Sequence, residues 1–241
     1  MTEEMDTKAL LGLIADGVRQ TALHYGLWFA ETVHHCGLEK ALEAEKTAGD
    51  AIFPLYMKRL SKILGFELEG DLPKALAGLD REDVARLAEG VAVNWLAVDG
   101  LWFQAVENLE GMDAAKRCND TCWTRFAPIE ASHIRSRLGL PEPGGIPALR
   151  RALEHRLYGR INSWEIVEET ATSLVFRMNQ CRVQNARKRK GLPDYPCKSG
   201  GMAEYIGFAR QIDPRLVVTC LGCPPDPHPE EWFCSWRFAI E

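Results

Sequence analysis

The sequence predicts an α+β protein: an N-terminal helical bundle built from a duplicated helical unit, followed by a C-terminal antiparallel sheet with helices on one face. Residues 6–139 place apolar side chains at helical spacing, and a segment of this region occurs twice. After residue 145, short alternating segments appear between shorter helices. We expect a helical repeat domain at residues 1–140 and a cysteine-rich α+β domain at residues 146–241.

The duplication organises the helical half. Residues 26–65 align with residues 100–139 without a gap, and ten of the forty positions are identical, against roughly two or three expected from composition. Each copy is predicted to be a long helix followed by a second helix. Glycine favours helix ends because it enters the left-handed conformation without a steric clash. The matched glycines that predict these ends are Gly37 and Gly111 in the middle of the copies, and Gly65 and Gly139 at their ends.

Proline and aromatic residues also recur in the two copies. Pro54 and Pro128 are equivalent, and each is expected to break or kink its helix. The Trp-Phe pairs at residues 28–29 and 102–103 are expected to anchor the core, because large aromatic side chains dominate core burial.

Two motifs in the helical half have a spacing that suits a metal. Cys118 and Cys122 share a helix face, but they align with alanines, which favours small buried residues over metal ligands. Two Glu-x-x-His pairs, at residues 31–34 and 130–133, have the spacing found in di-iron bundles. They are not equivalent under the duplication, so we expect surface or helix-end residues.

A mixture of carboxylates and indoles in the second copy predicts a ligand pocket. Such a mixture suits a small polar or cationic ligand, although helix caps and surface carboxylates explain the aspartates equally well. The candidate ligand-binding residues are Asp99, Trp102, Asp120 and Trp123.

The C-terminal half begins after Pro141–Gly145, a linker with two prolines and two glycines. The pattern then predicts helix, two strands, two helices and two strands. The expected ranges are a helix at 146–158, strands at 161–169 and 173–180, helices at 182–190 and 202–211, and strands at 216–220 and 232–240.

Five of the eight cysteines lie in this half, and Cys220 and Cys223 form a CxxC motif. Four thiolates make a closed tetrahedral zinc site, and a CxxC motif supplies two of them from one turn. Cys197 lies in a loop that could fold back over this turn. The favoured zinc ligands are Cys197, Cys220, Cys223 and Cys234, with Cys181 outside the shell. Free or redox-active thiols, a disulfide, and an iron–sulfur cluster remain open alternatives.

This cysteine pattern over residues 146–241 resembles the zinc-bearing, small-molecule-sensing domain named after 4-vinyl reductase. The resemblance implies a zinc site beside a small-molecule pocket. The sequence has Cys220 where some of these domains have a carboxylate.

A looser likeness links the chain to the L-2-amino-thiazoline-4-carboxylic acid hydrolase family. It implies that Cys181 is a catalytic nucleophile, whose pKa the neighbouring Arg182 and Arg187 would lower. The whole chain also resembles an uncharacterised family of bacterial cytosolic proteins that share its Gly-Leu-Trp-Phe and Cys-Asn-Asp-Thr-Cys-Trp signatures.

Charge and apolar patterning limit the partners and the cellular location that we expect. A net charge of −5 gives no general attraction to nucleic acid, and we expect the basic run at residues 187–190 to be a solvated helix end. No apolar run approaches the roughly 18 residues of a membrane span, and residues 1–6 are acidic, unlike a signal peptide. We expect a cytoplasmic protein with no nucleic-acid or membrane partner, and we consider a homodimer.

The leading hypothesis is a cytosolic zinc-binding protein with a sensor-like small-molecule pocket between the α+β domain and the helical repeats. The alternatives are a cysteine-dependent hydrolase of a small heterocyclic substrate and an iron–sulfur protein. The sequence names no ligand.

Overall fold

The computed structural model of the chain describes residues 5–241, and its packing divides the chain into two compact units. The first unit is Met1–Ala77 and the second is Gly78–Glu241. Each unit contains one copy of the duplicated helices. The expected domain boundary between residues 140 and 146, where the second helical repeat ends, stays a prediction.

The first unit is a helical hairpin with a short β-ribbon. Helix α1 begins after Asp6, whose Oδ1 accepts a hydrogen bond of 2.8 Å from the backbone N–H of Ala9. This cap satisfies a donor that has no partner within the helix. The elements are α1 (Thr7–Cys36), α2 (Leu38–Leu64), β1 (Leu68–Glu69), β2 (Leu72–Pro73) and α3 (Lys74–Ala77).

The second unit begins with the other copy, α4 (Arg81–Glu110) and α5 (Met112–Leu138). These helices have 30 and 27 residues, as α1 and α2 do, and Asp80 caps α4 as Asp6 caps α1. Every helix boundary in the second copy therefore lies 74 residues after its equivalent in the first. The duplication predicted from the sequence is confirmed.

A single glycine joins the two helices of each copy. Gly37 has φ +86° and Gly111 has φ +84°. L-amino acids with a side chain rarely adopt these angles, which explains why glycine occupies both positions. The predicted helix ends at these residues are confirmed.

The two helical prolines do not break their helices. Helix α2 continues through Pro54 and α5 continues through Pro128. A break is therefore wrong, and a kink, the other expected outcome, stays a prediction. The ring of Pro128 packs against Gly207, where an added Cβ would lie 3.1 Å from the proline Cδ. Packing of this kind can hold a helix together across a missing hydrogen bond.

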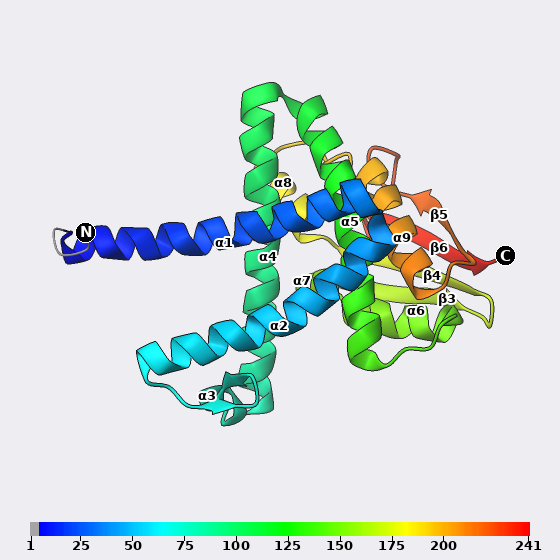
Figure 1. The fold of residues 1–241 in the computed structure, drawn as a ribbon. Helices are drawn as coiled ribbons and strands as arrows, with labels where there is room; N and C mark the ends of the chain where they lie inside the picture. The colour runs from blue at the N-terminus through cyan, green and yellow to red at the C-terminus, as the bar shows by residue number, and fades with distance from the viewer. Residues whose placement is uncertain (1–4) are drawn as a thin grey trace. The chain divides into compact units, whose positions relative to one another are not determined.

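The remainder of the second unit is an antiparallel sheet with helices (Figure 1). The strand order is β3-β4-β6-β5, and each neighbouring pair is antiparallel. The predicted order of elements is confirmed, with one short helix added. The elements are α6 (Gly145–Glu154), α7 (Leu157–Ile161), β3 (Ser163–Glu169), β4 (Ser173–Gln180), α8 (Arg182–Arg189), α9 (Lys198–Ile212), β5 (Leu216–Gly222) and β6 (Cys234–Ile240).

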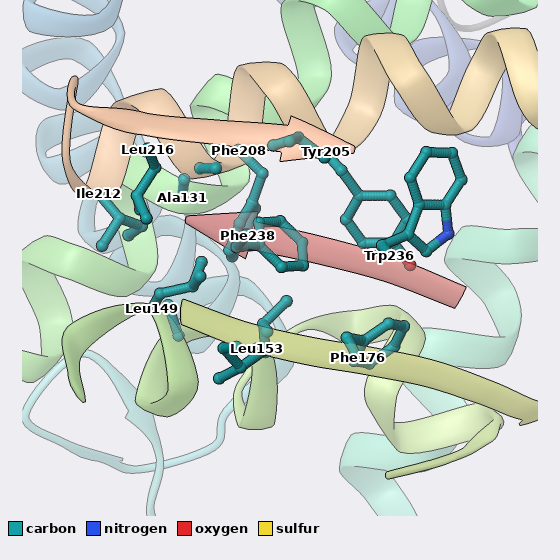
Figure 2. Packing of buried hydrophobic residues seen from close by; sticks show 14 of the residues in the cluster. Ala131, Leu149, Leu153, Phe176, Tyr205, Phe208, Ile212, Leu216, Trp236 and Phe238 are labelled. Atoms are coloured by element: carbon teal, nitrogen blue, oxygen red, sulfur yellow. The ribbon is translucent and has the colours of Figure 1, made fainter. Parts of the chain in front are cut away.

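Helices cover one face of this sheet, as expected. Leu216 and Val218 of β5 are buried, whereas Val217 between them is exposed. This alternation is typical of a sheet with one solvated face. Figure 2 shows the core on the covered face, where side chains of α6 and α9 meet those of β4 and β6. Its fully buried members include Leu149, Phe208, Trp236 and Phe238.

The expected core position of the repeated tryptophans is wrong. Trp28 is 66% exposed and Trp102 is 61% exposed, while the adjacent Phe29 and Phe103 are half-buried. Consecutive residues point about 100° apart on a helix, so both members of a pair cannot face the same neighbour. The phenylalanine of each pair is the more buried member.

The paired cysteines of α5 are also not buried. Cys118 and Cys122 are both exposed, which corrects the prediction of small buried residues. The helix contact falls instead at Ala115, which is 1% exposed, as is its equivalent Ala41. Among the described residues, no helix has an apolar stretch long enough to cross a membrane.

Candidate functional site

The second unit contains a cavity of about 510 Å³. Helix α4 contributes Asp99 and Phe103 to its wall, α5 contributes Trp123, and β6 contributes Trp236. Helix α8, helix α9 and the loop between them complete the lining. Most of the exposed wall is apolar, as in many small-molecule sites, but several charged and polar side chains also line it.

Thiols form one wall of this cavity. Four of the five C-terminal cysteines line it: Cys181, Cys197, Cys223 and Cys234. The sulfur atoms of Cys197 and Cys223 lie 3.5 Å apart, and Cys223 also hydrogen-bonds the thiol of Cys234. The side-chain amide of Gln184 donates a hydrogen bond of 3.4 Å to the sulfur of Cys197.

The loop before α9 folds back over the CxxC turn, as expected. The backbone N–H of Lys198 donates a hydrogen bond of 2.9 Å to the carbonyl oxygen of Pro224. The ammonium group of Lys198 also pairs with the carboxylate of Asp226 at 2.7 Å. These contacts hold Cys197 beside Cys223.

Cys220, the first cysteine of the CxxC motif, does not line the cavity. It lies on β5 opposite Trp236 and packs, half-buried, against the core of the covered face. Burial raises the pKa of its thiol, and the charge of Cys234 acts in the same direction. Cys220 therefore lies near the thiol cluster but takes no part in the sulfur contacts that join Cys197, Cys223 and Cys234.

The environments of Cys181 and Cys197 shift their pKa values in opposite directions. Burial raises the pKa of Cys181 to about 12. The pKa of Cys197 is lowered, first by the hydrogen bond from the Cys223 thiol and also by the one from Gln184, which together outweigh burial. The nucleophile expected at Cys181 thus lies in surroundings that favour the protonated thiol.

The described residues do not form a metal site in this conformation. Among residues 5–241, no group of three or more His, Cys, Asp or Glu side chains is arranged to hold a metal ion. The thiols contact one another in sequence, from Cys197 to Cys223 to Cys234, and do not surround a common point.

The four predicted ligand-binding residues separate into two groups. Asp99 and Trp123 line the cavity. Trp102 does not, and Asp120 instead pairs with the ammonium group of Lys116 at 3.1 Å. Trp102, three residues after Asp99 on α4, is exposed to solvent.

Aromatic rings surround the Trp123 side of the cavity. Trp123 meets Trp95 edge to face at 6.0 Å and Tyr158 at 6.2 Å, measured between ring centroids. Burial raises the pKa of Tyr158, and the charge of Asp99 is among the further causes, which places Asp99 near this ring. Tyr158 was not predicted, because it lies on α7, outside the cysteine and repeat patterns.

Glu204 and Tyr195 are further wall residues that were not predicted from the sequence. Glu204 is buried and pairs with Arg156 at 2.6 Å. The hydroxyl of Tyr195 is buried and has no hydrogen-bond partner among the described residues. The two prolines that flank Tyr195 in the Pro193–Pro196 loop were the available signal that its position is fixed.

Glu130, expected at the surface, is buried in an ion pair. Its Oε2 accepts a hydrogen bond of 2.8 Å from Nε of Arg156, and its Oε1 accepts one of 3.0 Å from the backbone N–H of Leu157. The surface expectation is therefore wrong, since the partner is supplied by a residue 26 positions later.

Residues 77–240 match a family described as Family of unknown function (DUF6125). The chain belongs to this family. The matched DUF6125 region coincides closely with the second unit, Gly78–Glu241, so it includes the whole cavity and all five C-terminal cysteines. No curated protein and no solved structure matches the chain. The DUF6125 match fits the expected resemblance to an uncharacterised family.

Proposed function

We propose that the DUF6125 region of this chain is a small-molecule-binding, sensor-like domain that also binds zinc through thiolates. The observation that carries this proposal is the cavity of about 510 Å³ with four cysteines on one wall and an aromatic cluster on another. A concave space of this size is in the usual range for small-molecule sites. A thiolate metal site beside the cavity would link ligand binding to the conformation of the CxxC turn.

The proposed zinc ligands are those predicted from the sequence: Cys197, Cys220, Cys223 and Cys234. Three of them already share sulfur contacts, and thiolates are the soft ligands that zinc prefers. Cys220 is the fourth because it shares the CxxC turn with Cys223. Because the thiols do not surround a common point in this conformation, their side chains would have to rotate on binding.

The expected resemblance of residues 146–241 to the 4-vinyl reductase domain, which combines zinc with small-molecule sensing, motivates this proposal and stays a prediction from the cysteine pattern. All eight cysteines are free thiols, which agrees with a reducing compartment such as the expected cytoplasm. The alternative, a cysteine-dependent hydrolase that uses Cys181, is less well supported, since burial raises the pKa of this thiol to about 12.

Elemental analysis of protein purified without added metal tests the zinc site. We expect about one zinc per chain, loss of zinc in the Cys223→Ser variant, and unchanged zinc in the Cys118→Ser variant, which alters an exposed thiol of α5. Folded wild-type protein that contains no metal would refute the zinc site. Iron with visible absorption would instead establish the iron–sulfur alternative.

The identity of the fourth ligand needs a separate pair of variants. Cys220→Ser should lower the zinc content and Cys181→Ser should not. The reverse result would show that Cys181, which lines the cavity, replaces Cys220 in the metal shell.

A further inference from the structure

We propose that the ligand of the cavity carries a protonated amine on an apolar, preferably aromatic, body, and that the carboxylate of Asp99 is its counter-ion. This inference rests on the proposed small-molecule site and names the chemistry of its ligand. It does not depend on whether zinc binds.

Asp99 is a carboxylate that lacks a partner. It is half-buried on α4 and lines the cavity, yet it makes no hydrogen bond or ion pair with any residue in the described part of the chain. Burial raises the pKa of its carboxyl group above the ordinary value. An ionised carboxylate in such surroundings is costly unless a donor or a cation approaches it.

The aromatic rings beside Asp99 suit a cation. Trp123 and Tyr158 both line the cavity, and their centroids lie 6.2 Å apart in an edge-to-face arrangement. The face of an indole or phenol ring attracts an ammonium group, and this attraction strengthens when water is excluded. A carboxylate together with aromatic rings recognises an amine better than either does alone.

Other buried groups near the cavity add negative charge. Glu204 lines it, and the buried Glu130 pairs with the same arginine as Glu204. One guanidinium, that of Arg156, serves both carboxylates, at 2.7 Å from Glu130 and 2.6 Å from Glu204. No buried cation remains for Asp99 among the residues that line the cavity.

The basic side chains that line the cavity come from α8 and its end, and they favour an anion only weakly. Arg182, Arg189 and Lys190 are exposed, so water and salt screen their charges. Arg187 is half-buried, but it already donates a hydrogen bond of 2.7 Å to the carbonyl oxygen of Pro193. Because the charge of Asp99 is less screened than these basic groups, we expect the ligand to carry a positive charge.

Three probes of the same shape test the inference by isothermal titration calorimetry of the full chain. They are 2-phenylethylamine, its neutral analogue 2-phenylethanol and the anion 3-phenylpropanoate. We expect the amine to bind at least about tenfold more tightly than the alcohol, and the anion to bind most weakly. The factor corresponds to one hydrogen bond to a charged group.

Two variants locate the effect. Asp99→Asn should abolish the preference for the amine, whereas Glu89→Gln, an exposed carboxylate on the same helix that does not line the cavity, should retain it. Asp99→Asn should also unfold at the same or a higher temperature than the wild type, because it removes an unpaired, half-buried charge. Loss of the preference in a variant with undiminished stability supports the inference.

Equal binding of the amine and the alcohol, or an Asp99→Asn variant that keeps the preference, would overturn the inference and leave the small-molecule site intact. Preference for 3-phenylpropanoate would overturn it in favour of the basic residues of α8. Failure of all three probes to bind would count against both the amine and the small-molecule site.

Discussion

The sulfur atoms of Cys197 and Cys223 lie 3.5 Å apart, although 26 residues separate them in the sequence. Cys197 is the residue immediately before α9, and Cys223 follows the end of β5. A backbone hydrogen bond between Lys198 and Pro224 fixes this approach. The thiol wall of the cavity therefore depends on where a helix begins and a strand ends, and not on the CxxC motif alone.

Loss of the buried charge on Glu130 should destabilise the second unit. Glu130→Gln would leave the buried guanidinium of Arg156 with one carboxylate in place of two. Because Glu204 still compensates the guanidinium, the expected cost is that of weakened hydrogen bonds to a charged group, about 1–3 kcal/mol. Urea unfolding followed by circular dichroism measures the change, with the exposed Glu230→Gln as the control. Equal stability of the two variants would mean that Glu130 contributes little.

Close approach of α9 to β6 makes Gly201 sensitive to any side chain. A Cβ at Gly201 would lie 2.6 Å from Cζ2 of Trp236, which is fully buried. Gly201→Ala should therefore cost about 1–3 kcal/mol through overpacking and alter the near-ultraviolet circular dichroism of the tryptophan. Gly90→Ala in α4 meets no atom within 4 Å and should instead stabilise the helix by about 0.5–1 kcal/mol. Equal stability of Gly201→Ala and Gly90→Ala would contradict the close packing of Gly201 against Trp236.

The stability of the second unit should depend on pH through the carboxyl group of Asp213. Its carboxylate accepts hydrogen bonds from Nε and Nη2 of Arg215 and from the backbone of Gly145. The interactions with Arg215 lower the pKa of Asp213 to about 2, despite the opposing effect of burial.

Because the pKa of Asp213 is lower in the folded state than in the unfolded state, its stabilisation is present above about pH 4 and is lost as the pH falls toward 2. Asp213→Asn should be less stable than the wild type by about 1–3 kcal/mol at pH 7, and the gap should narrow below pH 4. Urea unfolding from pH 7 to pH 3 measures it. A gap that stays constant over this range would show that the charge of Asp213 does not matter.

The sequence predicted the parts of the fold that local rules determine. Gly37 and Gly111 mark helix ends because their backbone angles exclude other residues, and this requirement is visible without the partner helices. The exposure of Trp28 and Trp102 was not predictable in the same way. Which side of a long helix is covered depends on the neighbouring elements, and an aromatic residue alone does not reveal it.

The candidate site was predictable in its chemistry and less so in its geometry. The cysteine pattern led to Cys197, Cys223 and Cys234, and the carboxylate–indole mixture led to Asp99 and Trp123. The cavity itself depends on long-range contacts, such as the approach of α9 to α5 and to the sheet, that no local pattern encodes. For the same reason Tyr158 and Glu204 were missed.

The optical spectrum of the Co²⁺-substituted protein tests the thiolate site most directly, because cobalt in a tetrahedral thiolate shell gives intense visible and near-ultraviolet bands. We expect these bands in the wild-type chain and in Cys118→Ser, and their loss in Cys223→Ser. A wild-type protein that shows only the weak bands of cobalt bound by water and oxygen ligands would contradict the proposed site.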